Sequence, residues 1–223
     1  MDWPALRLSL QLALATALLL LPLGLAAGRW LARSRHPLKP LAEALLALPL
    51  VLPPTVLGYY LLVNMGEATP LGALYQRVSG RSLVFSFDGL LVASVVFNIP
   101  FALMPMQRAF EAIPAELIDA ARSCGLGPWQ RLWRIELPLA WTGVASGLVM
   151  TVAHTLGEFG VVLMVGGSIP GETRTIAIAI YDRVQSFDLA GAATMSALLL
   201  AMSLATLLVT AWLSQRSLQR RWG

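Results

Sequence analysis

The sequence predicts an all-α integral membrane protein with about five transmembrane helices, and three observations support this fold class. Hydrophobic residues make up 57% of the 223 positions and charged residues only 13%, which is too little polar surface to cover a soluble globule of this size. The apolar residues gather in long uncharged runs, and about 20 apolar residues of helix cross the hydrocarbon core of a bilayer. Lysine and arginine concentrate between these runs.

We expect the spans to form a single transmembrane domain that covers residues 1–223. The apolar runs that define them are 8–27, 41–63, 89–106, 138–163 and 189–213. The second run contains Pro49, Pro53 and Pro54. The first run is not expected to be a signal peptide, because its apolar stretch is longer than usual and lacks a clean small-x-small cleavage site.

The connections between the runs differ in positive charge, and this difference predicts the orientation of the chain. Eleven of the 16 basic residues fall on one side: Arg29, Arg33, Arg35, Lys39, Arg108, Arg122, Arg131, Arg134, Arg216, Arg220 and Arg221. The other five are Arg7, Arg77, Arg81, Arg174 and Arg183. Because cytoplasmic loops carry the excess of Lys and Arg, we expect a periplasmic amino terminus and a cytoplasmic carboxyl terminus. The tryptophans near the span ends agree, as interfacial anchors: Trp3, Trp30, Trp141 and Trp212.

Several function classes are disfavoured by the residues that the chain has and lacks. The isoelectric point near 9.8 follows from the cytoplasmic Lys and Arg, so nucleic acid is not an expected partner. Cys124 is the only cysteine and has no metal-ligand spacing around it, so we expect no metal or cofactor on this chain. The only lysine, Lys39, follows Leu38 rather than glycine, which excludes a P-loop. A membrane serine protease is disfavoured because His154 is the only histidine in a span and no GxSG string occurs.

The stretch 111–138 is charged and broken by glycine, and it predicts two short amphipathic helices. The first opens near Pro114 and stops at Gly125. Its expected apolar face consists of Ile113, Leu117, Ala120 and Cys124. The second opens at Pro128 and is expected to end at Pro138. One side of this second helix carries Trp129, Leu132 and Trp133, and the other side carries Arg131 and Arg134. The pattern alone fits two roles equally well: docking against another protein, or lying flat on lipid headgroups.

The same stretch resembles the EAA loop of ABC importer permeases, whose pattern is EAA-x3-G-x9-I-x-LP. The matching residues, at every spacing, are Asp119, Ala120, Ala121, Gly125, Ile135, Leu137 and Pro138. Asp119 departs from the usual Glu, which keeps the charge and shortens the reach. In that family the loop forms coupling helices that sit in a groove of the ATP-binding subunit. We therefore call residues 111–138 the coupling loop, and its candidate contacts with an ATPase are Glu116, Asp119, Ala120, Ala121, Gly125, Leu132, Leu137 and Pro138.

Each matching residue type has a physical reason to stand in such a loop. Small alanines let a helix approach a partner surface closely. Gly125 supplies a backbone conformation that a side chain would penalise. Asp119 offers a carboxylate to a backbone amide or an arginine of the partner. Alanine is also simply a helix former, glycine a cap and aspartate a solvated residue, so the joint spacing is what favours docking.

Two further stretches resemble permeases of molybdate ABC transporters, and with the coupling loop the likeness covers nearly the whole chain. They are LPLVLPPTVLGYYLLVNMG at 48–66 and HTLGEFGVVLMVGGSIPGETRTIAIAIY at 154–181. The resemblance implies a type I ABC importer permease fold in the bacterial inner membrane and a homodimeric channel for molybdate or tungstate. It also implies a periplasmic molybdate-binding protein and a cytoplasmic ATPase pair that holds the ATP and Mg²⁺. The alternative cargo is another oxyanion, such as sulfate or thiosulfate.

Polar residues in the third and fourth runs suggest a translocation path, because polar groups in a membrane helix face a pathway or another helix. The candidate path and gate residues are Ser94, Asn98, Thr151, His154, Thr155, Gly157, Glu158 and Gly160. We expect the gate at Gly157–Gly160, near the outer end. Interhelical hydrogen bonding is an equally good explanation for His154 and the threonines. Glu158 would repel a dianion, so we expect it to pair with Arg174 or His154 instead.

The external segment 170–188 holds the candidate contacts with the binding protein, Glu172 and Arg174. Its string TRTIAIAIYDRV repeats apolar residues, which favours a surface or re-entrant helix over an ordinary solvated loop.

Overall fold

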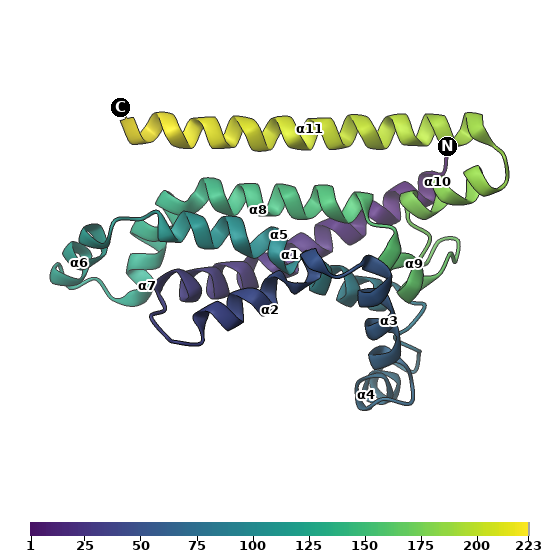
Figure 1. Ribbon diagram of the computed structural model, residues 1–223, viewed down its shortest axis with the longest axis horizontal. Helices are drawn as coiled ribbons and strands as arrows, with labels where there is room; N and C mark the ends of the chain where they lie inside the picture. Colours follow the sequence, from purple (N-terminus) through teal and green to yellow (C-terminus); the bar gives the residue numbers. More distant parts are fainter. Residues whose placement is uncertain (223) are drawn as a thin grey trace.

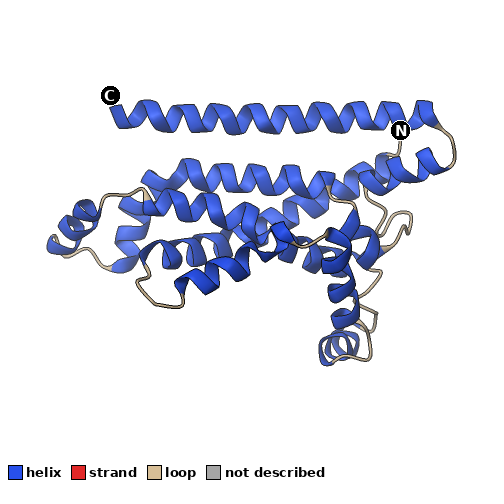
Figure 2. Ribbon diagram, viewed as in Figure 1, coloured by secondary structure: helices blue, strands red, loops and turns tan. Residues whose placement is uncertain are grey.

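The computed structural model describes residues 1–222, with side chains up to Trp212, and its regular elements are helices (Figure 2). In chain order these are α1 Trp3–Arg33, α2 Lys39–Val51, α3 Pro54–Met65, α4 Pro70–Ser79, α5 Phe87–Glu111, α6 Ala115–Ser123, α7 Pro128–Arg131, a π-helical turn η1 Leu132–Glu136, α8 Leu137–Gly157, α9 Gly160–Gly166, α10 Ile176–Gln185 and α11 Leu189–Trp222. The side chains of the tail arginines Arg216, Arg220 and Arg221 lie outside the described part.

Four helices are long and apolar enough to cross a membrane, and a bent pair raises the number to five within the described residues. The four are α1, α5, the continuous helix 128–157 and α11, and the bent pair is α2 with α3. The all-helical membrane fold predicted from the sequence is therefore confirmed. Two of the spans are longer than their apolar runs. Helix α1 extends beyond 8–27 at both ends, and α5 extends beyond 89–106 chiefly at its carboxyl end.

The long helices run side by side, and shorter helices lie at both ends of the bundle (Figure 1). Helices α6 and α7 of the coupling loop lie at one end, together with the far end of α11. The amino terminus and α10 lie at the opposite end. The amino terminus and the coupling loop are thus on opposite sides of the bundle, as the charge distribution predicts. Which of these ends faces the cytoplasm stays a prediction.

Helix α5 lies between α1 and α8, and glycine pairs on both neighbours bring the backbones together. Gly24 and Gly28 of α1, and Gly143 and Gly147 of α8, are each spaced four residues apart. A Cβ atom on Gly28 would lie 3.1 Å from the backbone nitrogen of Gln107, and one on Gly147 would lie 2.7 Å from a backbone oxygen of α5. Small residues at this spacing are a usual means of close helix packing in membranes. These four positions were not predicted from the sequence.

The apolar run 41–63 does not form one straight span. Helix α2 ends at Val51, α3 begins at Pro54, and the two axes differ by 107°. Leu52 adopts an extended conformation because the ring of Pro53 excludes the helical region for the residue before it. Pro54 then opens α3, where its missing N–H is not needed. The bend turns α3 toward α9, where a Cβ atom on Gly58 would lie 2.8 Å from the Cβ of Met164.

The fourth run, 138–163, also differs from expectation at both ends. Pro138 does not end the second short helix, because α7, η1 and α8 form one continuous helix from Pro128 to Gly157. The π-helical turn accommodates the proline: Leu137 donates its N–H to the carbonyl of Leu132, five residues back, and this widening makes room for the ring of Pro138. At the other end the helix stops at Gly157, and the separate helix α9 follows.

Candidate functional site

The first helix of the coupling loop, α6, is closed by a glycine turn. Gly125 has a φ of +76°, in the left-handed region that penalises a side chain. Its N–H donates to the carbonyl of Arg122 at 2.9 Å, and the N–H of Leu126 donates to the carbonyl of Ala121 at 3.1 Å. These two bonds make a Schellman motif. No atom lies within 4 Å of a Cβ added at Gly125, so the backbone conformation, not lack of space, requires glycine here.

The face of α6 that packs inward is not the one predicted. Ile118 is 2% exposed and Ala121 is also buried, and both face the rest of the chain. Of the predicted apolar face only Ile113 is buried, whereas Leu117 is 46% exposed. The exposed residues of α6 and its turn include Glu116, Leu117, Asp119, Ala120, Cys124 and Gly125. The prediction was wrong because Ile113 lies before the helix and is not in register with it.

The helix that follows adds aromatic surface to this outward face. Trp129 and Trp133 are both exposed and pack edge to face, with ring centroids 5.7 Å apart. Leu132 and Leu137 are half-buried, and Pro138 is exposed. The candidate ATPase contacts are therefore exposed or half-buried, except Ala121, which packs inward. Asp119 forms a surface ion pair with Arg122 at 3.0 Å.

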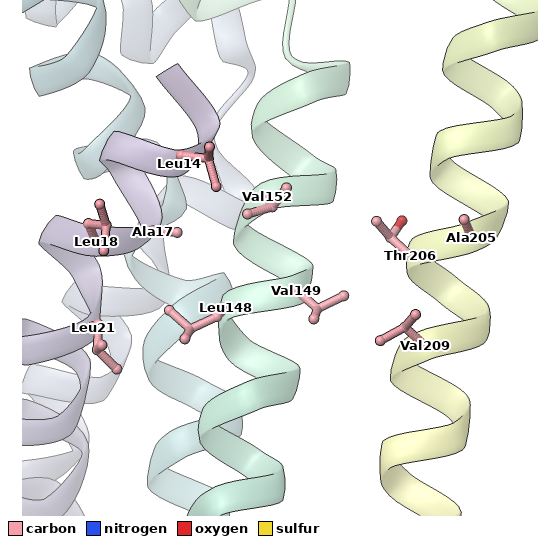
Figure 3. Close-up of a pocket in the computed structure, with 10 residues that line it drawn as sticks. All are labelled: Leu14, Ala17, Leu18, Leu21, Leu148, Val149, Val152, Ala205, Thr206 and Val209. Atoms are coloured by element: carbon pink, nitrogen blue, oxygen red, sulfur yellow. The ribbon is translucent and has the colours of Figure 1, made fainter. Parts of the chain in front are cut away.

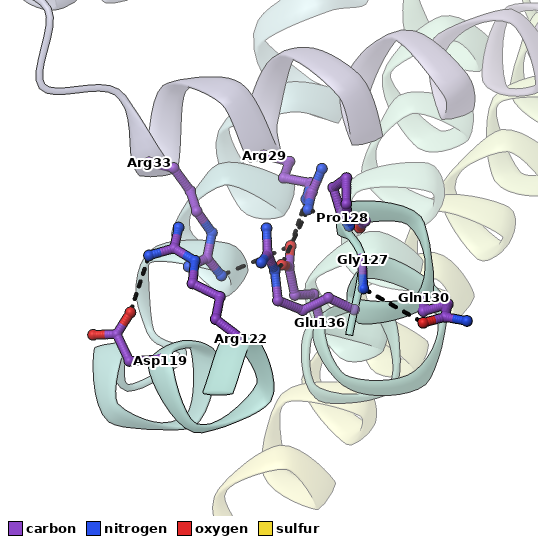
Figure 4. Close-up of polar contacts among 9 residues, drawn as sticks. Arg29, Arg33, Asp119, Arg122, Gly127, Pro128, Gln130 and Glu136 are labelled. Carbon is purple, nitrogen blue, oxygen red and sulfur yellow. Dashed lines mark hydrogen bonds and ion pairs between the residues drawn. The ribbon is translucent and has the colours of Figure 1, made fainter. Parts of the chain in front are cut away.

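Glu136 fixes the coupling loop to the end of α1, and we call this residue and its three arginines the Glu136 cluster (Figure 4). The Glu136 side chain is 0% exposed. Arg29 donates to it from Nε at 2.5 Å and from Nη2 at 3.1 Å, and Arg131 donates from Nε at 3.1 Å. Arg33 lies 3.7 Å away. A buried carboxylate is stable only when it is paired in this way.

The Glu136 cluster was missed by sequence reasoning. The arginines were counted only for topology, and Glu136 occupies the variable position of the I-x-LP match. The available signal was a lone acid at the start of an apolar span, because such residues seek a basic partner. The Glu136 cluster links two long helices mechanically. The coupling loop continues into α8 without a break, and Glu136 is bonded to Arg29 of α1, which lies 107 positions away in the sequence.

Several candidate path residues form a polar network inside the chain, made of Thr16, Ser94, Asn98 and His154. Thr16 donates to Ser94 at 2.9 Å, Asn98 donates to the Ser94 carbonyl at 2.8 Å, and Nδ1 of His154 lies 3.0 Å from Oδ1 of Asn98. The network connects α1, α5 and α8 and is buried except at His154. Thr16 was not predicted, although it is one of two hydroxyl residues in the first apolar run.

The remaining path candidates are also placed by local bonds. Thr151 and Thr155 are buried and donate to carbonyls four residues back, both at 2.8 Å. Interhelical and intrahelical bonding thus accounts for the buried polar groups among these path candidates. His154 is half-buried and stacks on Phe101, with ring centroids 3.8 Å apart, and Gly157 is exposed. A path-lining role for these residues stays a prediction.

The sequence suggested that Glu158 pairs with Arg174 or His154, but in the structure its carboxylate has a different partner. Its Oε1 accepts the backbone N–H of Val161 at 2.9 Å, so it caps the start of α9 after the break at Gly157. The expectation failed because the helix break turns the carboxylate toward free backbone donors of the next helix.

The external segment forms a helix, α10, as its apolar repeat indicated. The helix begins at Ile176, and the Thr175 hydroxyl caps it. Arg174 is engaged within the chain, since it lies 3.1 Å from Asp182 and 3.7 Å from Asp2. Glu172 is exposed. Of the two candidate contacts with a binding protein, Glu172 is therefore the more accessible.

A cavity of about 440 Å³ lies between α1, α8 and α11, and its lining is apolar (Figure 3). The residues that line it are Leu14, Ala17, Leu18, Leu21, Leu148, Val149, Val152, Ala205, Thr206 and Val209. The Thr206 hydroxyl donates to the carbonyl of Ser203 at 2.7 Å, so this cavity offers an oxyanion little hydrogen bonding. Among the described residues no three His, Cys, Asp or Glu side chains are grouped to hold a metal ion.

Several proteins named as transport permeases are similar in sequence to this chain. A relative in Azotobacter vinelandii, named molybdenum transport system permease protein ModB, is 48% identical over 86% of this chain and 84% of its own. The protein of the same name in Escherichia coli K12 is 37% identical over 98% of this chain and 96% of its own. A sulfate transport system permease protein, CysW of Synechococcus elongatus, is 31% identical over 96% of this chain and 74% of its own.

The fold has a solved counterpart. A bacterial ABC transporter involved in the import of alginate superposes with a TM-score of 0.71 and 14% identity, over 97% of this chain and 78% of that one. At this identity the likeness concerns the fold alone. The family model described as "binding-protein-dependent transport system inner membrane component" matches residues 20–219. The chain therefore belongs to this family, and it is a multi-pass permease subunit of a binding-protein-dependent transporter, not the ATPase.

Proposed function

We propose that this chain is the membrane-spanning subunit of an ABC importer of molybdate and acts as a homodimer. The observation that carries the proposal is the outward face of the coupling loop, which stands on a helix that continues unbroken into the membrane. A cytoplasmic ATPase pair docks on this face, and a periplasmic molybdate-binding protein delivers the anion at the opposite end. The cargo assignment is supported by relatives named as molybdenum permeases that cover most of the chain.

The geometry indicates how motion of the ATPase reaches the membrane. A push on the exposed surface of Ala120 and Trp129 moves α6 and α7. Since α7, η1 and α8 are one helix, the push tilts α8 directly. The Glu136 cluster transmits the same displacement to the end of α1, because charge-assisted bonds resist stretching more than apolar contacts do. Gly125 fixes the angle between the two short helices.

The path itself forms where two copies meet. The side chains that contribute to it come from the accessible end of the polar network, at His154 and the exposed break at Gly157. An oxyanion needs donors, so backbone N–H groups at the break are suitable, whereas carboxylates are not. Glu158 is compatible with an anion path because its carboxylate already accepts a backbone N–H of α9. Binding in the path is weak, and selectivity lies in the external binding protein.

The orientation follows from charge. The end that carries the coupling loop holds the excess of Lys and Arg and therefore faces the cytoplasm. The amino terminus, α10 and Glu172 then face the periplasm, where Glu172 contacts the binding protein. Arg174 supports that surface from within through its pairs with Asp182 and Asp2.

Transport by the reconstituted complex tests the function. Proteoliposomes that contain this chain, its ATPase and its binding protein are expected to accumulate molybdate only when ATP is present on the ATPase side. Excess tungstate should compete, and sulfate at equal concentration should not. Sulfate uptake with no competition from molybdate would favour the second candidate, a sulfate permease, which the 31% identical CysW relative supports. Absence of ATP-dependent uptake of either anion would contradict the proposal.

A further inference from the structure

The end of α1 and the coupling loop enclose a second cavity of about 880 Å³, which we call the arginine cavity. Its lining residues are Leu21, Pro22, Leu25, Ala26, Arg29, Trp30, Arg33, Ser34, Arg122, Trp129, Arg131, Leu132 and Trp133. The cavity is polar at the end of α1 and apolar along the preceding two turns of that helix, which span roughly 12 Å. It opens between exposed tryptophans, since Trp30, Trp129 and Trp133 are all exposed.

The arginine cavity has more positive charge than its own carboxylates compensate. Four arginines line it, and two carboxylates pair with them: Glu136 with Arg29, Arg33 and Arg131, and Asp119 with Arg122. Two positive charges remain. Figure 4 shows the side chains of Arg33 and Arg122 pointing toward one another from α1 and α6. Like charges held this close require a counter-charge.

Arg33 is the arginine whose bonding is least complete. Its side chain is 27% exposed and lines the cavity, and its Nε and Nη2 atoms are buried without a hydrogen-bond partner. The nearest carboxylate, Glu136, lies 3.7 Å away and already accepts bonds from Arg29 and Arg131. Glu136 thus neutralises Arg33 incompletely, and Arg33 lines the cavity, so its accessible part can meet an anionic ligand there. Arginine binds phosphate oxygens with two parallel N–H bonds.

The shape of the cavity decides which anion fits. A small free oxyanion would leave most of this volume and the whole apolar wall of Leu21, Leu25 and Ala26 unused. A phospholipid uses both parts: its phosphate meets the arginines, and an acyl chain lies along α1. The surrounding tryptophans match the usual position of aromatic side chains at the level of lipid headgroups. Basic pockets between helices at the cytoplasmic surface suit anionic headgroups.

We propose that the arginine cavity binds an anionic phospholipid of the inner leaflet, with its phosphodiester between Arg33 and Arg122 and its acyl chain against the apolar wall of α1. The lipid then bridges α1 and α6 and supplies the counter-charge that the Glu136 cluster lacks. The cavity lies beside the outward face of α6 and shares Trp129, Leu132 and Trp133 with the docking surface, whereas Ala120 and Leu117 do not line it.

Native mass spectrometry of the intact transporter complex tests this site without any transport measurement. The complex is extracted from bilayers of equal phosphatidylglycerol and phosphatidylcholine, and the retained lipids are counted. The wild type is expected to retain phosphatidylglycerol in preference. Arg33→Gln should lower this retention about tenfold, because the variant loses a charge-assisted contact with the phosphate, and the effect is moderated since the side chain is partly hydrated. Arg35→Gln removes the same charge from an exposed position two residues away and should leave retention unchanged.

The remaining arms separate the other occupants. Arg122→Gln, on the far wall, should also lower retention, which keeps the test informative if Arg33→Gln fails to assemble. Inorganic phosphate at millimolar concentration should not displace the lipid, and displacement would overturn the lipid assignment in favour of a free anion. Equal retention of both lipids by the wild type, or equal loss in Arg33→Gln and Arg35→Gln, would overturn the site. Loss of the ATPase or of the second copy, with lipid retention unchanged, would also overturn it.

Discussion

Replacing Glu136 by glutamine should weaken both the stability of the chain and its coupling to the ATPase. The substitution keeps the shape of the side chain but removes the charge that three arginines share. Breaking a buried ion pair by removing one partner costs about 3–5 kcal/mol. Because Arg29 and Arg33 are each about one-quarter exposed and water can hydrate them in the variant, we expect the lower end, about 3 kcal/mol.

This loss can be measured as thermal stability. At roughly 2–4 °C per kcal/mol for a chain of this length, the variant should lose its monodisperse form at a temperature about 6–12 °C lower than the wild type. Size-exclusion chromatography of the detergent-solubilised protein after heating gives this temperature. Glu67→Gln is the matched control, since Glu67 is exposed, and it should shift the temperature very little.

The same variant should separate ATP hydrolysis from uptake. If the Glu136 cluster carries motion from the coupling loop to α1, Glu136→Gln should lower the amount of anion imported per ATP, at a temperature where the complex is intact. An unchanged ratio together with an unchanged melting temperature would refute the reasoning. The Glu67→Gln control should keep the wild-type ratio.

Three further predictions follow from other parts of the fold. The Gly125→Val variant should insert normally but lower uptake relative to ATP hydrolysis. A β-branched residue at φ +76° is strained by about 1–2 kcal/mol or more and changes the angle of the loop. Normal uptake by this variant would contradict the prediction. Gly147→Leu should lower the melting temperature of the solubilised chain, since even its Cβ would lie 2.7 Å from a backbone oxygen of α5, whereas the same change at exposed Gly157 should not. A reporter fused after Gly223 should be active in the cytoplasm, and periplasmic activity would overturn the charge-based orientation.

The spans were predictable from the sequence because hydrophobicity is a local property of each run. The coupling loop was predictable for a different reason: its glycine and prolines restrict the backbone at fixed spacing, so Gly125 and Pro128 lie where the pattern indicates. The inward face of α6 was not predictable in this way, since it depends on where the helix begins. A shift of one residue in the helix register moves Leu117 from the core to the surface.

Other features depend on contacts that the linear sequence does not contain. Glu136 meets Arg29 across 107 positions, and Thr16 meets Ser94 across 78. Both pairs form because glycines let α1 approach α5 and α8, which no single run reveals. The break before α9 was also hidden, because the run around Gly157, residues 139–163, contains no proline and no Asp, Lys or Arg. Its one acidic residue, Glu158, which caps α9, looked instead like a pairing partner for Arg174.

Docking of an ATPase on the outward face of α6 can be measured with a residue that the chain already carries. Cys124 is the only cysteine, is exposed and follows α6 directly. Its alkylation by a maleimide should be fast in the isolated chain and slow about tenfold or more when the ATPase subunits bind, because docked surfaces exclude water. A cysteine at Val78, 82% exposed on α4, in a Cys124→Ser background should react equally fast in both states. Unchanged alkylation of Cys124 in a complex that hydrolyses ATP would contradict the account.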